Sequence, residues 1–416
     1  MREREQQRSV QARTLQARQA IAEGAIAVLS QSGVAGLTHR AVAKAANVSL
    51  ASTTYHFATK GDILAEASRR LFAGYLEAFK RLESRISGGL QPEIVRLEDL
   101  VARVVLKAVE RDRTRSLAWC EIILHGGRSD NGRMLAQDWF AQLDAIWCSI
   151  AAQLDSAADR SDVSAEVDRA IGLIFLLLPL GFARSEIQEL LDGRTDLLAL
   201  LAGYAERDVA RSGDEVSRSG AESTGRSKDV RERIIQATID ILVEEGASTV
   251  SYRAVADRSG MVRSGPSYYF PSIHGLLETA QQALFERAKA RYREGLGDPL
   301  SAAMTEARLI DLTTAIFLRE VFEFSRENIG YYSVWMSAAQ NPDLRPVLAS
   351  FFGDQYAAWR RRLGTVVENE IDQSAVLDIQ ALFVGKLIRA ITAGVGMADL
   401  SGARKDFAVV IRRASA

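Results

Sequence analysis

A run of hydrogen-bonding side chains between residues 49 and 60 is the part of the chain best suited to binding chemistry. Small or hydrogen-bonding side chains occur at Ser52, Thr53, Thr54, Tyr55, His56 and Lys60. No carboxylate lies within this run. Such side chains suit an anionic partner, because they donate hydrogen bonds to phosphates and to the edges of bases. The run therefore predicts a contact surface for nucleic acid.

Residues typical of enzyme active sites do not gather anywhere in the chain. The four histidines are scattered, at His39, His56, His125 and His274. A P-loop, a dinucleotide-binding glycine pattern and a nucleophile elbow are all missing from the sequence. The two cysteines, Cys120 and Cys148, have no Cys or His at metal-ligand spacing. We therefore expect no enzyme activity, no metal site, no disulfide and no cofactor.

Helical signals on both sides of the run define the element that positions it. Apolar residues recur at helical spacing over Ile21–Leu29, and Gly33 suits the left-handed residue that follows a helix. A second helix should start at the capping residue Thr38, a third after a tight turn at 47–49, and a fourth at Thr59. Two short helices braced by a preceding one form a helix-turn-helix, whose second helix enters the major groove of DNA.

The same element occurs twice in the chain. A shift of 213 positions aligns Gly33–Phe72 with Gly246–Phe285 without a gap, and eleven of the forty positions are identical. The identical residues of the first copy are Gly33, Arg40, Ala41, Val42, Ala43, Tyr55, Phe57, Leu64, Ala67, Leu71 and Phe72. Self-similarity at one fixed offset, the repeat offset, indicates a duplication. The later parts of the two halves look much less alike.

The segment VSLASTTYHFATKGDIL resembles the recognition segment of TetR-family regulators, and the resemblance covers Ile21–Phe72. The second copy, MVRSGPSYYFPSIHGLL, departs from the pattern: Tyr269 replaces the histidine, Ile273 replaces the lysine, and Pro266 falls in the first helical turn. A proline is tolerated there. The resemblance implies a three-helix DNA-binding head on a larger helical body, which binds a small ligand and pairs through its last two helices. It also implies repression as the usual outcome.

We therefore predict an all-α fold with two tandem TetR-like units, each a helix-turn-helix head plus a helical ligand-binding and dimerisation body. A stretch rich in Ser, Gly and alternating charge divides the halves and predicts a flexible linker. The predicted domains are 14–72 for the first head, 73–206 for the first body, 207–229 for the linker, 230–285 for the second head and 286–416 for the second body.

The apolar run Ala170–Ala183 is too short to span a bilayer and contains Pro179 and two glycines. We expect it to form a helix of the pairing bundle, with an ordinary core helix as the alternative. The segment MREREQQRSVQAR has no apolar core and does not read as a signal peptide. We expect a cytoplasmic protein with no membrane partner.

Candidate DNA contacts come from both copies. In the first half they are Thr38, His39, Arg40, Ser49, Leu50, Ala51, Ser52, Thr54, Tyr55, His56 and Lys60. In the second half they are Ser251, Tyr252, Arg253, Arg263, Ser264, Ser267, Tyr268 and Tyr269. Tyr55 is expected to reach a phosphate, with packing of the head as the alternative. A phosphate contact and a structural ion pair remain equally open for Arg40 and Arg253.

Local charge separates the two heads, although the whole chain carries a formal charge of only -1. Residues Arg13–Lys60 include five basic residues and one acidic residue, a formal charge of +4. Residues Arg226–Ile273 include seven basic and six acidic residues, a formal charge of +1. Because phosphate neutralisation contributes much of the affinity for DNA, we expect the first head to bind more strongly.

Aromatic residues outside the heads are candidates for an apolar ligand cavity, with ordinary core packing as the alternative for each. They are Trp119, Trp139, Trp147, Phe317, Phe324, Tyr331 and Trp335. His125 is expected to be a solvated loop residue.

The partners implied are a double-stranded DNA operator, a small-molecule effector of unknown identity, and the other half of the same chain. The sequence leaves a further homo-oligomer open. A fused pseudo-dimer with two different recognition helices predicts an asymmetric operator. The rival hypothesis is a ligand- or protein-binding adaptor whose second helix-turn-helix no longer binds DNA.

Overall fold

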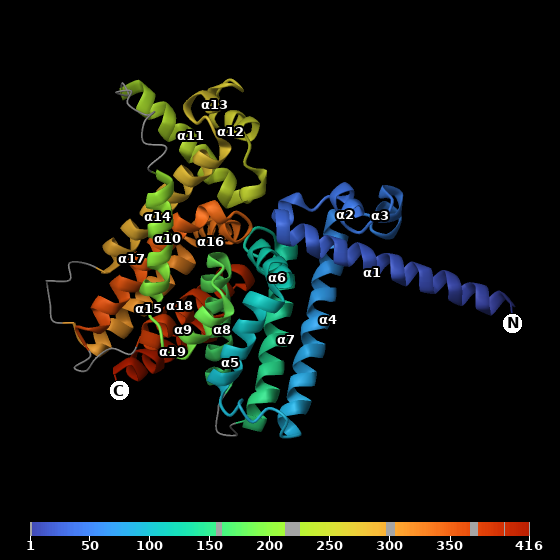
Figure 1. The fold of residues 1–416 in the computed structure, drawn as a ribbon, viewed down its shortest axis with the longest axis horizontal. Coiled ribbons are helices and arrows are strands. Elements are labelled where there is room, and N and C mark those ends of the chain that lie inside the picture. The colour runs from blue at the N-terminus through green and yellow to red at the C-terminus, as the bar shows by residue number, and fades with distance from the viewer. Residues whose placement is uncertain are drawn as a thin grey trace.

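A computed structural model describes residues 2–154, 160–212, 225–296, 304–366, 373–394 and 396–415. In these ranges every regular element is a helix, as Figure 1 shows. The predicted all-α class is confirmed.

The first four helices form a compact head. They are α1 (Arg2–Gly36), α2 (His39–Ala45), α3 (Leu50–His56) and α4 (Lys60–Ser87). The predicted break near Gly33 lies inside α1, where Gly33 adopts a left-handed conformation (φ 62°) and turns the last residues of the helix. A capping box between Thr59 and Asp62 starts α4, because each residue's side chain binds the backbone N–H of the other.

A helical body follows the first head. Its elements are α5 (Leu97–Leu106), the short π-helix η1 (Lys107–Arg111), α6 (Arg113–His125), α7 (Asp130–Leu154), α8 (Arg160–Leu180), α9 (Arg184–Leu191) and α10 (Leu197–Ser212). The long helix α4 packs along α6 and α7, so it connects the head with the body.

The second half repeats this order. The head-like part contains α11 (Gly225–Glu244), the 3₁₀ turn η2 (Ala247–Thr249), α12 (Tyr252–Ser259), α13 (Gly265–Tyr269) and α14 (Ile273–Leu296). The remaining elements are α15 (Glu306–Phe322), α16 (Ser325–Gln340), η3 (Pro342–Leu344), α17 (Arg345–Leu363), α18 (Gln373–Ala393) and α19 (Met397–Ser415).

The predicted linker, 207–229, overlaps a helix at each end. Helix α10 extends to Ser212 and α11 begins at Gly225, so both flanks of the predicted linker are helical. Residues 213–224 lie outside the described residues. Arg, Ala and Glu in the flanks are good helix formers, which allows the last turn of α10 to continue beyond residue 207.

The core of the molecule lies where α8 of the first half packs against α18 of the second half. Their backbones touch at two glycines: a Cβ at Gly172 would overlap the carbonyl oxygen of Ala381, and a Cβ at Gly385 would overlap that of Asp168. Only glycine permits such an approach. The predicted apolar helix is therefore buried directly against the other half, from Ala170 to Leu180.

Buried charges accompany this contact. The carboxylate of Asp168, only 1% exposed, binds Arg389 at 2.6 Å and Lys386 at 3.3 Å. Arg389 also binds Asp144 at 2.9 Å, and its guanidinium lies 4.7 Å from the centre of the Phe140 ring. Removing one partner from such a cluster leaves a buried charge unpaired, so the cluster favours one register of the two helices.

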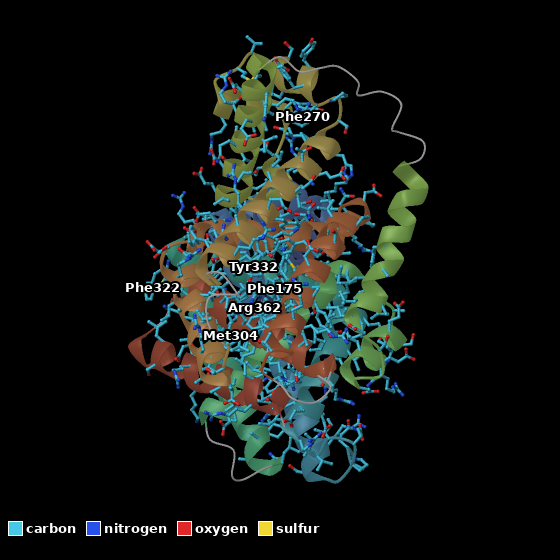
Figure 2. The ribbon with its side chains drawn as sticks, turned by 90° about the vertical axis from the view of Figure 1, so that its left-hand side faces the viewer. Phe175, Phe270, Met304, Phe322, Tyr332 and Arg362 are labelled. Carbon is cyan, nitrogen blue, oxygen red and sulfur yellow. The ribbon has the colours of Figure 1, made fainter. Side chains whose placement is uncertain are left out.

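Aromatic rings continue the core from one half to the other. Phe175 on α8 contacts Trp119 on α6 and Tyr332 on α16, with ring centres 6.1 Å apart in both pairs. Figure 2 shows Phe175 and Tyr332 together in the middle of the molecule, below the second head that contains Phe270. The two halves therefore share one continuous hydrophobic core.

Replacing Gly172 by Ala should destabilise the protein by about 3 kcal/mol, because the new methyl group forces α8 and α18 apart. Gly203→Ala is the matched control, since Gly203 lies in helix α10 with no described atom within 4 Å of an added Cβ. This control should gain up to about 1 kcal/mol from the higher helix propensity of Ala. Thermal unfolding of both variants measures the difference. A Gly172→Ala variant as stable as the control would contradict the direct backbone contact.

Candidate nucleic-acid interface

The turn of the first helix-turn-helix is built by local hydrogen bonds. The Thr38 hydroxyl accepts the backbone N–H of Ala41 at 3.1 Å and starts α2. The Ser49 hydroxyl accepts the N–H of Ser52 at 3.1 Å and starts α3. Between the two helices Asn47 adopts a left-handed conformation (φ 53°), which Asn tolerates better than most residues. The predicted helix-turn-helix elements are all present here.

The corresponding turn in the second half has the same backbone design. The Ser251 hydroxyl accepts the N–H of Ala254 at 3.2 Å and starts α12. Gly260 is left-handed (φ 68°), and the repeat offset aligns it with Asn47. Helix α13 has only five residues, with Pro266 in its first turn and no side-chain cap. Helix α13 is therefore shorter than α3, which has seven residues.

An arginine from the first helix of each head holds the end of the recognition helix. The guanidinium of Arg18 lies 4.8 Å from the centre of the buried Phe57 ring, and that of Arg231 lies 4.3 Å from the centre of Phe270. Arg231 also donates to the carbonyl of Tyr269 at 2.9 Å. Sequence reasoning missed this pair, although the repeat offset aligns Arg18 with Arg231 and would have revealed both.

The two tyrosines of the repeat point away from the core. Tyr55 and Tyr268 are each 81% exposed. Each ring lies edge-on to the next residue, His56 at 5.1 Å and Tyr269 at 5.2 Å between ring centres. Their hydroxyl groups are therefore accessible to a partner, while the neighbouring rings restrict their orientation.

Other predicted contacts of the first head form bonds within it. His39 Nδ1 lies 3.3 Å from the hydroxyl of the buried Thr53. Thr54 donates its hydroxyl to backbone carbonyls of its own helix, and Thr38 and Ser49 act as caps. The remaining predicted residues on or beside α3 are half-buried or exposed: Arg40, Leu50, Ala51, Ser52, Tyr55 and His56.

In the second half, too, some predicted residues form bonds within the helices around α13 and others are exposed. The Tyr252 hydroxyl donates to the carbonyl of Phe270 at 2.7 Å, which makes this tyrosine structural. Ser267 donates to the carbonyl of Ser264 at 3.0 Å. Arg253 lies 3.9 Å from Asp257, a long ion pair between exposed side chains. The predicted residues that are exposed in this head are Ser251, Arg253, Arg263, Ser264, Ser267 and Tyr268.

Lys60 lies at the junction of the two halves, where its side chain remains exposed. Its Nζ atom lies 3.5 Å from the carbonyl of Ala35, and burial lowers its pKa. It lines a cavity of about 410 Å³ whose walls include Glu121 of the first half and Gly246 of the second half.

His125 is not a solvated loop residue, so that prediction is wrong. It ends α6 and its Nε2 atom lies 2.9 Å from the Ser129 hydroxyl. Burial lowers its pKa to about 4, and the positive charges of Arg128 and Lys60 act in the same direction. The glycine-rich sequence around it indicated a loop, but the surrounding helices fold over it.

Two side chains connect the halves at the base of the heads. Arg128, after α6, donates to the carbonyl of Val243 at 3.1 Å and to the Ser333 hydroxyl at 2.6 Å. Gln340, at the end of α16, donates to the carbonyl of Ser30 at 2.9 Å. Each half therefore binds the C-terminal part of the other half's first head helix.

Glu121 lies at the same junction and carries an unusual carboxyl group. Burial raises its pKa to about 7, although Arg128 and the backbone N–H of Val34 oppose the shift. Its side chain also lies close to Gly33, where an added Cβ would come within 2.6 Å of the carboxylate. Ionisation of Glu121 near neutral pH therefore places a charge between the two heads.

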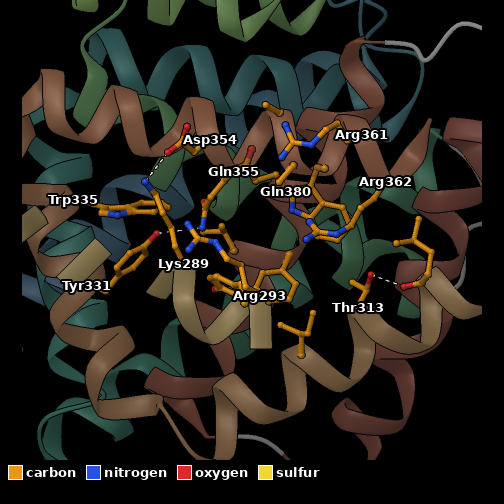
Figure 3. Close-up of a pocket in the computed structure, with 18 of the residues that line it drawn as sticks. Lys289, Arg293, Thr313, Tyr331, Trp335, Asp354, Gln355, Arg361, Arg362 and Gln380 are labelled. Carbon is orange, nitrogen blue, oxygen red and sulfur yellow. Dashed lines mark hydrogen bonds and ion pairs between the residues drawn. The ribbon is translucent and has the colours of Figure 1, made fainter. Parts of the chain in front are cut away.

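A cavity of about 370 Å³ lies in the body of the second half (Figure 3). Of the predicted ligand residues, Tyr331 and Trp335 line it. Phe317 is outside the lining and packs against Phe383 and Phe407, with ring centres 6.2 and 5.7 Å away. Phe324 is also outside it and lies 4.6 Å from the guanidinium of Arg291.

The three tryptophans predicted from the first half surround much less space. Trp119, Trp139 and Trp147 line a cavity of about 50 Å³. Trp139 packs edge-on against Phe72 at 4.9 Å, and its indole N–H donates to the Ser68 hydroxyl at 2.8 Å. These three tryptophans thus leave little space between them, whereas Tyr331 and Trp335 of the second half line a cavity of ligand size.

Comparison with known proteins supports the assignment of the first head. Residues 21–67 match the family model described as bacterial regulatory proteins, tetR family. The chain therefore carries a TetR-type N-terminal domain, which belongs to regulatory proteins and not to enzymes. No curated protein sequence matches the chain.

Two solved structures are similar to part of the chain. One is SCO7518 from Streptomyces coelicolor A3(2), described as a candidate transcriptional regulator, with 23% identity and a TM-score of 0.36 over 45% of this chain and 98% of that one. The other is the multidrug binding protein EbrR complexed with imidazole, with 20% identity and a TM-score of 0.33 over 43% of this chain and 93% of that one.

Among the described helices, none has the length and apolar character needed to cross a bilayer.

The junction predicts a pH effect on stability that depends on Glu121. Its folded-state pKa of about 7 lies above the ordinary value of 4.5, so the protein should lose stability as pH rises from about 4.5 through 7. Glu121→Gln removes this ionisation and still accepts the Val34 N–H. We expect the variant to lose less thermal stability than the wild type between pH 5.5 and pH 8.

Glu77→Gln is the control for this experiment, because Glu77 is exposed on α4, where its one close partner among the described residues is Arg81 at 3.9 Å. Its melting temperature should follow the wild type at both pH values. Equal pH dependence of the Glu121→Gln variant and the wild type would show that Glu121 is not buried in its neutral form.

Proposed function

We propose that the chain is a ligand-responsive transcription repressor that carries two TetR-like units and binds one asymmetric DNA operator as a fused pseudo-dimer. The observation that carries this proposal is the reciprocity of contacts between the halves. A two-fold interface requires that, if residue i contacts residue j of the partner, the equivalent of j contacts the equivalent of i. Residues of the two halves that the repeat offset aligns make matching contacts across the interface.

The glycine contacts between α8 and α18 obey the rule. Gly172 approaches the carbonyl of Ala381, and Gly385 approaches the carbonyl of Asp168. The repeat offset aligns Gly172 with Gly385, and it also aligns Asp168 with Ala381. The two contacts are thus copies of one contact, as in a dimer of identical subunits.

The contacts below the heads obey it as well. Arg128 donates to the carbonyl of Val243, and Gln340 donates to the carbonyl of Ser30. The repeat offset aligns Ser30 with Val243, and it brings the two donors to adjacent positions. Reciprocal contacts are therefore found near the heads as well as between the pairing helices α8 and α18.

Buried charge supports pairing of a first half with a second half over pairing of two second halves. Lys386 and Arg389 on α18 share the carboxylate of Asp168 on α8. The repeat offset aligns these two cations with Leu173 and Leu176, which are apolar. Two copies of α18 placed against each other would keep the pair of Lys386 with Asp406 but would bury each Arg389 without Asp144 and Asp168, an arrangement that costs several kcal/mol. The two halves are therefore complementary rather than interchangeable.

DNA recognition follows from the heads. Two heads in such a pair lie about one helical turn of DNA apart (~34 Å) and address successive major grooves. Their recognition helices differ in sequence, so the operator should have two different half-sites. The higher formal charge of the first head, +4 against +1, favours stronger binding by that head.

The alternative function, an adaptor that no longer binds DNA through its second half, has one observation in its favour. The recognition helix α13 is short, and beside it Val262 is 75% exposed where the first half carries Ser49. An exposed valine suits an apolar partner better than a phosphate. The salt dependence of DNA binding separates the two functions, since only phosphate contacts produce a steep dependence.

Footprinting on the operator, selected from genomic fragments, should show two dissimilar half-sites protected by one chain. Tyr55→Phe should weaken binding about tenfold, because it removes a hydrogen bond to a phosphate without disturbing the fold. Tyr268→Phe should weaken it less. Tyr75→Phe, a buried tyrosine of α4 whose hydroxyl lies 3.3 Å from Ser116, is the control for loss of a hydroxyl. A palindrome bound equally at both half-sites would contradict the asymmetric operator.

The mass in solution tests intramolecular pairing separately. Light scattering should give a mass of 45.6 kDa for the free protein and one chain per operator in the complex. Two chains on a palindrome would mean that only the first heads read DNA, and that the second halves serve assembly or sensing.

A further inference from the structure

We propose that the cavity in the second half binds an amphipathic organic anion, with its acidic group at an arginine cluster and its apolar part against aromatic rings. This inference rests on the proposed function, because it names the chemical class of the effector. It also implies one effector site per chain rather than one in each half.

Positive charge dominates the lining of the cavity. The described lining contains four basic residues, Lys289, Arg293, Arg361 and Arg362, but Asp354 is its only carboxylate. Lys289 is neutralised, because it binds Asp354 at 2.6 Å and Glu286 at 2.8 Å. Figure 3 shows Lys289, Arg293 and Arg362 gathered around the same space.

The three arginines are not neutralised in this way. Within the described part of the chain, no carboxylate forms an ion pair with Arg293, Arg361 or Arg362. Burial lowers the pKa of Arg362, and the adjacent charge of Arg361 lowers it further. Arg362 is half-buried and Arg361 is exposed, and their neighbouring positive charges repel each other unless an anion binds beside them. A carboxylate, sulfonate or phosphate accepts the bidentate hydrogen bonds that guanidinium groups offer.

The rest of the lining is apolar and aromatic. Tyr331, Tyr332 and Trp335 are each at most 2% exposed, and they pack edge-on or tilted against one another with ring centres 4.8–5.1 Å apart. Phe383 and Ile316 add to the same wall. This surface suits an aromatic or acyl group, since a ligand cavity gains affinity chiefly by burying apolar area.

Two buried polar atoms in the lining have no partner among the described residues. They are the indole N–H of Trp335 and the side-chain carbonyl oxygen of Gln380, on residues 1% and 3% exposed. A buried donor or acceptor without a partner costs about 1–3 kcal/mol, so such atoms mark a place where a ligand or water binds. An effector with a hydroxyl or amide group beside its acidic group satisfies both atoms.

The cavity is connected to the second head through one helix. Helix α14 contributes Lys289, Tyr292 and Arg293 to the lining, and its first turns bury Leu276 and Ala280 in the second head. An anion bound at Arg293 therefore acts on the helix that carries the head. A ligand with different affinity for two positions of α14 shifts the head between them.

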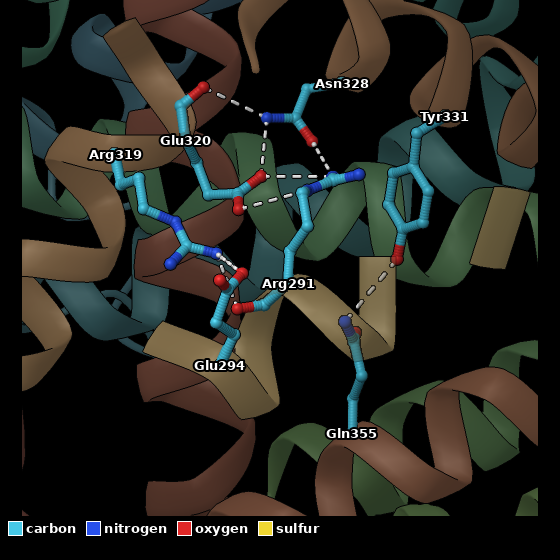
Figure 4. Close-up of polar contacts among 7 residues, drawn as sticks. All are labelled: Arg291, Glu294, Arg319, Glu320, Asn328, Tyr331 and Gln355. Atoms are coloured by element: carbon cyan, nitrogen blue, oxygen red, sulfur yellow. Dashed lines mark hydrogen bonds and ion pairs between the residues drawn. The ribbon is translucent and has the colours of Figure 1, made fainter. Parts of the chain in front are cut away.

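A buried polar cluster below this lining anchors the same helix (Figure 4). Arg291 on α14 binds Glu320 on α15 at 3.2 Å, and Asn328 on α16 donates to Glu320 at 2.9 Å. Glu320 is fully buried. Arg319 on α15 also donates to the carbonyl of Arg291 at 2.6 Å. The end of α14 is thus fixed to the body beside the cavity, since Arg291 lies between the lining residues Lys289 and Tyr292.

The test compares two fluorescent probes on the full chain. 1-Anilinonaphthalene-8-sulfonate carries a negative group on apolar rings, and N-phenyl-1-naphthylamine has the same rings without the charge. We expect the sulfonate to bind one site per chain and at least tenfold more tightly than the neutral probe. Decanoate should displace the sulfonate probe, which would mean that the site accepts a carboxylate as well as a sulfonate.

Variants locate the site. Arg362→Gln and Arg361→Gln should each lower the affinity for the sulfonate about tenfold and leave the neutral probe unaffected. Arg360→Gln is the matched control, because Arg360 adjoins them in sequence but binds Asp196 and does not line the cavity. Melting temperatures of all three variants identify any loss of fold. Equal affinity of the two probes, or equal effects of Arg360→Gln and Arg361→Gln, would overturn the proposal.

Operator binding is measured in parallel, so that the two proposals fail separately. If the sulfonate binds as expected while the chain binds no DNA, the ligand class stands and the regulator function fails. If the chain binds its operator but neither arginine variant changes the affinity for the sulfonate, the ligand class fails and the regulator function stands.

Discussion

The direct contact of helix backbones between α8 and α18 is the constraint on which the rest of the structure depends. Gly172 and Gly385 allow each helix to touch a carbonyl of the other, which fixes both their separation and their register. The bodies are built around these two helices and the heads stand on the bodies. The position of helix α3 relative to the corresponding helix α13 is therefore decided in the middle of the molecule.

Around this symmetric contact the two halves have become different in charge and packing. Asp168 lies on one side of the pair and its two cations lie on the other, so each half completes the other's buried charge. Trp119, Trp139 and Trp147 leave a cavity of only about 50 Å³ between them in the first body, while the aromatic residues of the second body line a cavity of about 370 Å³.

The first head was predictable in detail because its structure depends on neighbouring residues. Thr38 and Ser49 cap helices through bonds to residues three positions later, and Gly33 has the left-handed conformation expected after a helix. The repeat also indicated the cap at Ser251, which starts α12 in the second half. Side chains with distant partners were harder: His125 was expected to be a solvated loop residue, but it ends α6 and is affected by the charges of Arg128 and Lys60.

The sequence by itself determined the helical class, the helix-turn-helix of the first head and the repeat, because periodicity, caps and glycine conformations act over a few residues. Only the tertiary structure decided which aromatic residues surround a cavity and which fill the core. Tyr331 and Phe317 look alike in the sequence, yet one lines the cavity and the other packs against Phe383. The reason is that a cavity depends on the volumes that several distant helices leave between them, and no local pattern encodes that difference.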